Sequence, residues 1–244
     1  MSLQTALASM VLSTGLFAAG GPPMMTDGTG TPGHGNWDLN LGFKSEHVKG
    51  STRYEAPIID LNYGLGERIQ LKVESSYVYL NEEDSNNHGI GNAKAGVKWR
   101  FYENDTHDFA LSTYPQYTFA PIPKNIDKAL ADVEESWFFP LEMSKRFDTI
   151  TITGEVGYLA VIHEDDWIKT GVVAGYSPNK SLELLAEVYR NAQSNGEEES
   201  IFLNAGATYA FTAQINGLFS LGYEVKSPSS PQSELLFVGL QLLF

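Results

Sequence analysis

Residues 149–163 read TITITGEVGYLAVIH, and their side chains alternate between apolar and polar types along most of the stretch. Even-numbered positions from Ile150 to Ile162 are mostly apolar, whereas Thr151 and Glu155 stand among the odd-numbered ones. A period of two predicts a β-strand with one apolar and one polar face. The stretch is much longer than the ~5–6 residues of a typical soluble strand, and it exceeds the ~9–11 residues that a tilted strand needs to cross a bilayer. It therefore predicts a membrane-spanning strand.

The same alternation returns along the chain after residue 36 and divides it into regular segments. The predicted strands are 36–47, 53–65, 67–80, 89–103, 107–119, 134–147, 149–163, 166–177, 180–193, 199–212, 214–226 and 233–244. Tight turns follow the even-numbered strands, and longer, acidic connections follow most of the odd-numbered ones. Outer-membrane barrels differ in this way between their two ends, and single-chain bacterial barrels have an even number of strands. We therefore predict an all-β fold, a transmembrane antiparallel β-barrel of twelve strands over residues 36–244, in the bacterial outer membrane.

The end of the chain separates this barrel from a soluble one whose apolar face points inward. Residues 234–244 read ELLFVGLQLLF, a final amphipathic strand that stops on Phe244. A terminal aromatic residue of this kind is similar to the assembly signal of bacterial outer-membrane proteins. Aromatic residues also gather near both ends of the predicted strands, as in the interfacial girdles of membrane proteins. We therefore expect the apolar face to contact lipid and the polar face to line the lumen.

Composition supports the same class and excludes others. The 244 residues include 30 acidic and 16 basic ones, which gives a net charge of −14 and argues against a nucleic-acid partner. There are no cysteines, so disulfides, thiolate metal sites and cysteine nucleophiles are excluded. No stretch approaches the ~20 apolar residues of a spanning helix. We expect a monomer whose surroundings are the lipid bilayer, including lipopolysaccharide, and we expect no cofactor and no metal.

The residues before the first strand fall into two parts. Residues 1–20 contain an apolar run that ends in small residues, which predicts a signal peptide, although the first lysine is only Lys44; an ordinary N-terminal helix is the alternative. Residues 21–35 are rich in glycine and proline, so they support neither helix nor strand. We predict that this part enters the barrel from the tight-turn end and plugs the lumen; a disordered periplasmic tail is the alternative. The plug residues are Pro22, Pro23, Met24, Met25, Thr26, Asp27 and Pro32.

The odd or even position of each residue within its strand predicts which side chains line the lumen. The charged members of this set are Asp38, Asp60, Glu74, Lys94, Lys98, Arg100, Glu142, Glu155 and Glu187, and the apolar members include Leu159, Phe202 and Phe237. Charges of both signs are interspersed, so one interpretation is a structural network of salt bridges that fills a narrow barrel. The apolar members beside them favour a path for amphipathic or hydrophobic ligands.

Several motifs resemble one family of outer-membrane channels. They are PPMMTDGTGTPGHGNWDLNLGF at 22–43, DLNYGLGERIQL at 60–71, GVKWRF at 96–101 and the terminal strand. Together they are similar to the MetA-pathway of phenol degradation family, and the first is the most specific of the four. The resemblance implies a barrel of about this size that takes up hydrophobic compounds such as aromatics or long-chain lipids. We therefore expect a passive channel, rather than an enzyme, with small hydrophobic ligands or detergent in its lumen.

Prolines within the strands suggest how an apolar ligand leaves the barrel. Pro57, Pro115 and Pro140 lie in the second, fifth and sixth predicted strands, and proline lacks the N–H that a strand ladder needs. We hypothesise that the adjacent pair, Pro115 and Pro140, weakens the wall and forms a lateral gate. Prolines at a bulge or strand end are the alternative.

Two further segments carry weaker predictions. The loop PKNIDKALADVEE at 123–135 predicts a short helix with Asn125 as its N-cap and with Ile126, Leu130 and Val133 on one face. His163 stands beside three acidic residues in a predicted turn, a pattern that permits a cation or a His–Asp pair. The alternatives to a channel are thus an outer-membrane enzyme acting on lipid or peptide, and a structural or adhesive barrel.

Overall fold

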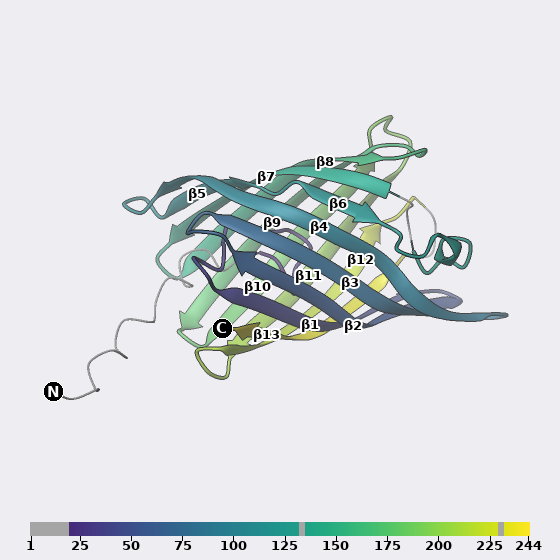
Figure 1. Ribbon diagram of the computed structural model, residues 1–244, viewed down its shortest axis with the longest axis horizontal. Coiled ribbons are helices and arrows are strands. Elements are labelled where there is room, and N and C mark those ends of the chain that lie inside the picture. The colour runs from purple at the N-terminus through teal and green to yellow at the C-terminus, as the bar shows by residue number, and fades with distance from the viewer. Residues whose placement is uncertain (1–19, 132–134, 229–231) are drawn as a thin grey trace.

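Antiparallel pairing runs from each strand to its neighbour around the whole sheet, and the first strand, β1, pairs with the last, β13, to close a barrel (Figure 1). The computed structural model describes residues 20–131, 135–228 and 232–244. The strands are β1 (Trp37–Val48), β2 (Ser51–Gly64), β3 (Ile69–Glu82), β4 (Asn86–Asn104), β5 (Phe109–Thr113), β6 (Gln116–Phe119), β7 (Glu135–Phe147), β8 (Ile150–Val161), β9 (Trp167–Asn179), β10 (Leu182–Gln193), β11 (Glu199–Ala210), β12 (Ile215–Lys226) and β13 (Glu234–Leu243). The all-β membrane-barrel prediction is confirmed.

The barrel has twelve strand positions, because β5 and β6 occupy one position end to end between β4 and β7. The predicted continuous strand 107–119 is wrong at Tyr114 and Pro115, which belong to neither β5 nor β6. Pro140 stands in the part of β7 that lies opposite this gap, between its pairings with β5 and with β6. Since neither proline can donate a backbone hydrogen bond, the ladder between the fifth and sixth positions is interrupted here.

The two ends of the barrel differ in their connections. One end, called here the short-turn end, has connections of two to four residues, from Leu65–Arg68 to Phe211–Gln214. The opposite end, called the loop end, has the longer connections that follow β6, β8, β10 and β12. The connection predicted between strands 67–80 and 89–103 is mostly wrong, because β3 extends to Glu82 and β4 begins at Asn86. Long strands therefore extend from this side of the loop end, as Figure 1 shows for β3 and β4.

The connection after β6 folds back instead of forming the predicted helix. Its described residues, 120–131, contain one 3-10 turn, η1 (Pro123–Asn125), whose N-cap is Ile122 and not Asn125. Asn125 is buried, and its side-chain amide donates to the carbonyl of Ile90 over 2.8 Å. The predicted position Val133 and residues 1–19 of the predicted signal peptide lie outside the described residues.

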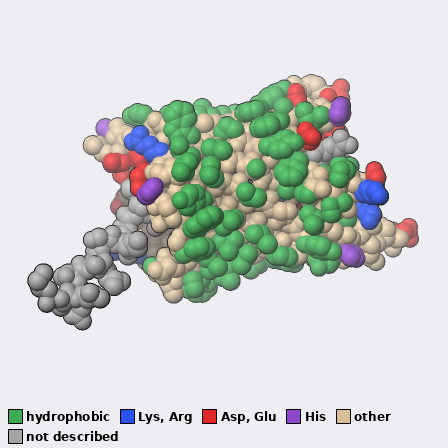
Figure 2. All heavy atoms as spheres, in the orientation of Figure 1, with side chains coloured by type: hydrophobic (Ala, Val, Ile, Leu, Met, Phe, Trp, Pro, Cys, Tyr) green, Lys and Arg blue, Asp and Glu red, His purple; other side chains and the backbone are tan. Residues whose placement is uncertain are grey.

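An apolar belt surrounds the outside of the barrel. Figure 2 shows hydrophobic side chains over the middle of the visible face and charged side chains gathered at its two ends. The exposed set includes Val97, Trp99, Phe139, Ile150, Val156, Val172, Val188, Leu203, Leu221 and Val238. Closed pairing leaves no free sheet edge, and an apolar outer band above a polar interior is the arrangement that lipid requires. Among the described residues, no helix has the length and apolarity needed to cross a bilayer.

Candidate functional site

The N-terminal segment, residues 20–33, contacts inward-facing side chains on several strands around the barrel. It leaves β1 along the short-turn end, where the Thr31 hydroxyl donates to the carbonyl of Glu67 over 2.8 Å. Its far portion turns back on itself, since the Gly21 N–H donates to the Thr26 carbonyl over 2.7 Å. The purple segment in Figure 1 lies among the strands rather than outside them. The contacts described below run from β4 through β8 and β10 to β12.

Glu187 on β10 holds the tip of this segment, defined as residues 23–27. Its carboxylate accepts hydrogen bonds from two consecutive backbone amides, those of Met25 at 3.1 Å and Thr26 at 2.6 Å. The side-chain amide of Asn204 on β11 donates to the same carboxylate. On the far side, the Ser220 hydroxyl of β12 donates to the Pro23 carbonyl over 2.8 Å. Hydrogen bonds to an ionised acceptor are stronger than neutral ones, so the tip is firmly placed by its backbone.

Asp27 makes the charged contact of the segment. The Lys98 ammonium on β4 lies 3.1 Å from the Asp27 carboxylate and also donates to the Gly28 carbonyl. The same ammonium lies 3.6 Å from the Glu142 carboxylate of β7, to which the Ser112 hydroxyl of β5 donates. Lys98 thus joins the segment to two strands, and its own side chain is almost fully buried.

Met24 and three wall glycines make the apolar part of the fit. Met24 is 6% exposed and packs in a buried cluster with Val173 of β9 and Leu185 of β10. Burying a methionine side chain contributes about 1.5–3 kcal/mol. A Cβ atom added at Gly171 would overlap the Thr26 hydroxyl, one at Gly206 would lie 2.5 Å from Met24 Cε, and one at Gly64 would overlap the Gly33 carbonyl. These wall positions therefore accept the segment only because they lack side chains.

A second set of charged side chains fills the lumen beside β2, β3 and β4. The Lys72 ammonium lies 3.2 Å from the Asp60 carboxylate and 2.8 Å from that of Glu74, which also pairs with Lys94 at 3.2 Å. Tyr114, the fully buried residue before Pro115, lies under both lysines of this region, with its ring centroid 4.5 Å from Lys98 Nζ and 6.0 Å from Lys72 Nζ. This half of the lumen is therefore filled by paired charges.

The opposite side of the lumen is more apolar toward the loop end. Phe202 and Tyr189 are buried, and the Phe138 ring lies flat against the wall where Gly157 has no side chain. The Lys169 ammonium lies 5.5 Å from the centroid of the Phe138 ring. The Phe237 ring likewise covers Gly42 and Gly239. Apolar surface therefore begins beside the tip of the segment and continues toward the loop end.

The remaining predicted lumen residues take different places. Asp38 accepts a hydrogen bond from Gln241 over 2.9 Å, and Leu159 pairs with Phe138 across β7 and β8. Arg100 lies at the short-turn end, where its guanidinium donates to the Glu67 carbonyl over 2.9 Å. Glu155 lies opposite Glu142 in the β7–β8 register and accepts from the Asp27 amide over 3.4 Å. Arg100 is thus the member of the predicted set that lies at the rim.

The three prolines of the predicted gate do not lie together. Pro57 is exposed and falls in a bulge of the β2–β3 ladder between Glu55 and Ile58. Pro115 and Pro140 flank the ladder gap, where the Thr113 hydroxyl donates to the Pro140 carbonyl over 2.7 Å. On the outer surface beside the gap, Tyr117, Phe119, Trp137 and Phe139 form a continuous series of ring contacts.

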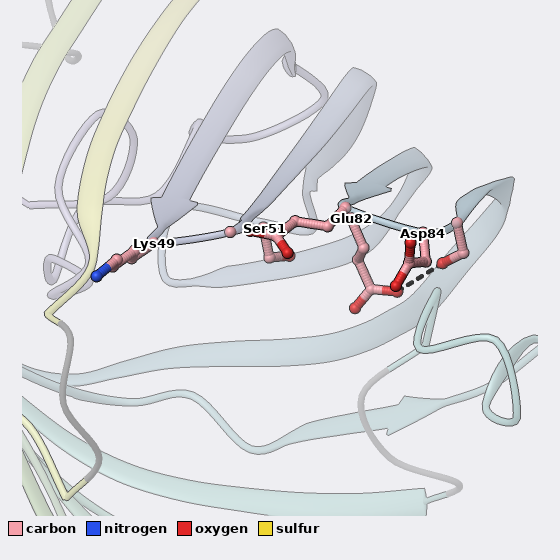
Figure 3. A pocket seen from close by; sticks show the side chains of 7 residues that line it. Lys49, Ser51, Glu82 and Asp84 are labelled. Carbon is pink, nitrogen blue, oxygen red and sulfur yellow. Dashed lines mark hydrogen bonds between the residues drawn. The ribbon is translucent and has the colours of Figure 1, made fainter.

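The loop end is partly covered by the connection after β6. Leu130 is fully buried against Val78 and Leu80, and the Arg53 guanidinium donates to the carbonyls of Ala129 at 2.7 Å and Leu130 at 2.9 Å. A separate open pocket of about 470 Å³ lies at the rim between the β1–β2 turn and the β3–β4 turn. Figure 3 shows Lys49, Ser51, Glu82 and Asp84 along it, with the Ser85 hydroxyl donating to Glu82 over 2.7 Å. This pocket lies away from the N-terminal segment.

The candidate His–Asp site is a turn with structural contacts. His163 adopts a positive φ of 67° in the connection between β8 and β9. The carboxylate of Asp166 accepts from the Tyr158 hydroxyl and from the Val161 amide, the latter over 3.1 Å. Within the described parts of the chain, no group of three or more metal-ligating side chains is placed to hold an ion.

Sequence reasoning missed the wall positions that receive the segment. Gly64, Gly171 and Gly206 were not singled out, although glycine within a strand is a known sign of close backbone approach. Tyr114 and Tyr189 were likewise absent from the predicted set, whereas Asn204 falls on the polar face of its predicted strand. The alternation along their strands places these side chains on the inward face, but the N-terminal segment lies far from them in the sequence.

The fold is similar to those of solved outer-membrane proteins. Neither protein-family models nor curated protein sequences match this chain. The COG4313 outer membrane channel from Pseudomonas putida F1 aligns with a TM-score of 0.68 at 14% identity, over 86% of this chain and 96% of that one. The NanC porin aligns with a TM-score of 0.63 at 9% identity, over 84% and 98% of the two chains, and the KdgM porin with 0.55 at 11%, over 84% and 99%. The chain therefore has the fold of outer-membrane channels and porins, a fold built for the bacterial outer membrane.

Proposed function

We propose that the chain is a passive channel for small hydrophobic or amphipathic molecules, with residues 21–35 as a plug. The observation that carries this is the path of the N-terminal segment, which contacts Lys98 on β4 at one side of the lumen and Ser220 on β12 at the other. A segment with contacts on opposite walls obstructs the water-filled path that a sugar or ion would need. It also borders an apolar surface, made by Val173, Tyr189 and Phe202, on which an apolar molecule can bind.

The similarity to the COG4313 outer membrane channel supports a channel function. The resemblance of residues 22–43 to the phenol-degradation channel family supports hydrophobic compounds as the class of solute. The porin NanC and KdgM folds are equally compatible with a channel for hydrophilic solutes. The N-terminal contacts favour the hydrophobic alternative, because they occupy the centre of the polar lumen.

Uptake in intact Gram-negative cells tests the choice of solute. Cells that express the chain should take up a hydrophobic fluorescent probe such as N-phenyl-1-naphthylamine several-fold faster than cells that express an empty vector. Sugar uptake, measured in the same cells, should stay at the background level. Equal acceleration of sugar and probe would instead identify a general porin.

We further propose that the ladder gap at Pro115 and Pro140 is a lateral exit to lipid. Cysteines placed at Thr118 and Ser136, which lie directly opposite each other on β6 and β7, form a cross-link beside this gap. Oxidation should reduce probe uptake several-fold, and reduction should restore it. The chain has no other cysteine to interfere.

A matched cross-link at Ser144 and Thr153 serves as the control, because these residues lie opposite each other on β7 and β8, where the ladder is continuous. Oxidation there should leave uptake unchanged. Unchanged uptake with both cross-links oxidised would show that the exit lies elsewhere.

A further inference from the structure

Two buried carboxylates of the barrel wall accept hydrogen bonds from backbone N–H groups of the tip of the N-terminal segment. Glu187 is 4% exposed and Glu155 is 5% exposed, and both accept backbone N–H groups of residues 25–27. Asn204 is the remaining donor to Glu187, and one oxygen of Glu155 has no hydrogen-bond partner. When the tip leaves, both carboxylates lose these donors.

No basic side chain of the described residues forms an ion pair with Glu155 or Glu187. Two ammonium groups lie in this part of the lumen: that of Lys98 is engaged by Asp27 and Glu142, and that of Lys169, opposite Gly157 in the β8–β9 register, lies 5.5 Å from the centroid of the Phe138 ring. Buried carboxylates require a counter-charge or hydrogen-bond donors, because their desolvation is costly. When the tip is absent, the space beside Glu155 and Glu187 therefore has a negative electrostatic potential.

The walls around these carboxylates are apolar and aromatic. Met24 of the tip fills the space between Val173 and Leu185, which are 0% and 5% exposed. The Tyr189 ring borders the same space, since a Cβ atom at Gly171 would meet both Tyr189 Cδ2 and the Thr26 hydroxyl. The tip thus combines N–H donors for the carboxylates with an apolar group for the pocket.

We infer that the tip subsite, made by Glu155, Val173, Leu185, Glu187 and Tyr189, binds an organic cation: a protonated amine carrying an aromatic or alkyl body. Such a molecule replaces the contacts that the tip makes with Glu155, Glu187 and the Val173–Leu185 pocket, with ammonium N–H groups on the carboxylates and its apolar body in place of Met24. The aromatic ring of Tyr189 borders the same space and is a side chain of a type that attracts cations. The inference rests on the proposed channel function, whose solute class it narrows.

Charge outside the subsite favours the same ligand. The chain carries a net charge of −14, and acidic residues gather in the loop-end connections, such as QSNGEEE at 193–199. A negative mouth raises the local concentration of cations and lowers that of anions.

Displacement of the tip by three solutes of one shape tests the inference. The full chain carries a single cysteine in place of Met25, labelled with an environment-sensitive dye, since Met25 is 40% exposed. The dye signal is titrated with 2-phenylethylamine, 2-phenylethanol and phenylacetate at neutral pH. The amine should act at a concentration lower than the alcohol by on the order of tenfold, because charged hydrogen bonds are the stronger ones. Phenylacetate should act most weakly.

The double variant Glu155→Gln and Glu187→Gln should lose the preference for the amine over the alcohol while keeping the response to the alcohol. Glu183→Gln is the matched control, because Glu183 is a buried carboxylate on the same strand that does not contact the tip. It should keep the preference. If the double variant does not fold, the single variant Glu155→Gln is used to compare the responses to the amine and the alcohol, because it retains the Glu187 contacts.

Equal responses to amine and alcohol in the parent chain, or a preference that persists in the double variant, would overturn the inference and leave the hydrophobic channel intact. A dye signal that responds to none of the three solutes would overturn the inference and also count against the channel function on which it rests.

Discussion

Removal of residues 21–31 should raise the single-channel conductance of the purified protein in planar bilayers by about fivefold or more, because the conductance of a water-filled pore follows its free cross-section. The deleted residues make the hydrogen bonds and the ion pair that join the N-terminal segment to Lys98, Glu155, Glu187 and Ser220, whereas the barrel strands begin only at Trp37. The deletion therefore empties the centre of the lumen without removing a strand.

Deletion of Asn195–Glu197 is the control, since these residues lie in the exposed connection between β10 and β11 and do not contact the segment. This variant should keep the low conductance of the parent. A deletion of 21–31 that conducts no better than the parent would show that the segment is not a plug.

A single side chain at Gly171 should reproduce much of that increase. In Gly171→Val the new side chain takes the place of the Thr26 hydroxyl and presses on Tyr189, so the tip is displaced from Glu187. Valine is favoured in strands, so β9 itself keeps its pairing. Conductance should rise several-fold, as measured in the same bilayers.

Gly154→Val is the matched control, because Gly154 lies on the adjacent strand β8 and a Cβ atom there meets nothing closer than 3.9 Å. It should leave conductance unchanged. The two effects should also not add: Gly171→Val in the chain that lacks residues 21–31 should cause no further increase, since the contact that it disrupts is already gone. Additive effects would mean that Gly171→Val acts on the barrel wall instead.

The barrel could be predicted because the side chains of each strand alternate between apolar residues that face outward and polar residues that face inward. The alternation in TITITGEVGYLAVIH predicted β8, and the exposed Ile150 and Val156 against the buried Thr153 and Glu155 follow that alternation. The face on which a side chain lies follows from its odd or even position in its own strand, so it can be predicted without knowing the partner strand. Strand ends agree to within a few residues for the same reason.

Errors arose where backbone hydrogen bonding or distant packing decided the outcome. The fifth strand read as continuous from its alternation, but the ladder is interrupted between Thr113 and Gln116, where Pro115 and Pro140 cannot donate a backbone N–H. The connection after β6 read as an amphipathic helix, yet Leu130 is held in the barrel mouth by Val78, Leu80 and the Arg53 guanidinium. Both outcomes depend on residues that lie far apart along the chain.

Local patterns along the chain were enough to predict the all-β class, the twelve strand positions, the outward and inward faces and the unusual glycine and proline content of residues 21–35. The wall residues that meet that segment could be identified only in the folded barrel. Glu187 is 161 positions from Thr26, and Lys98 is 71 from Asp27. Such contacts exist only after the strands close into a ring, since closure is what brings β4, β10 and β12 around one common space.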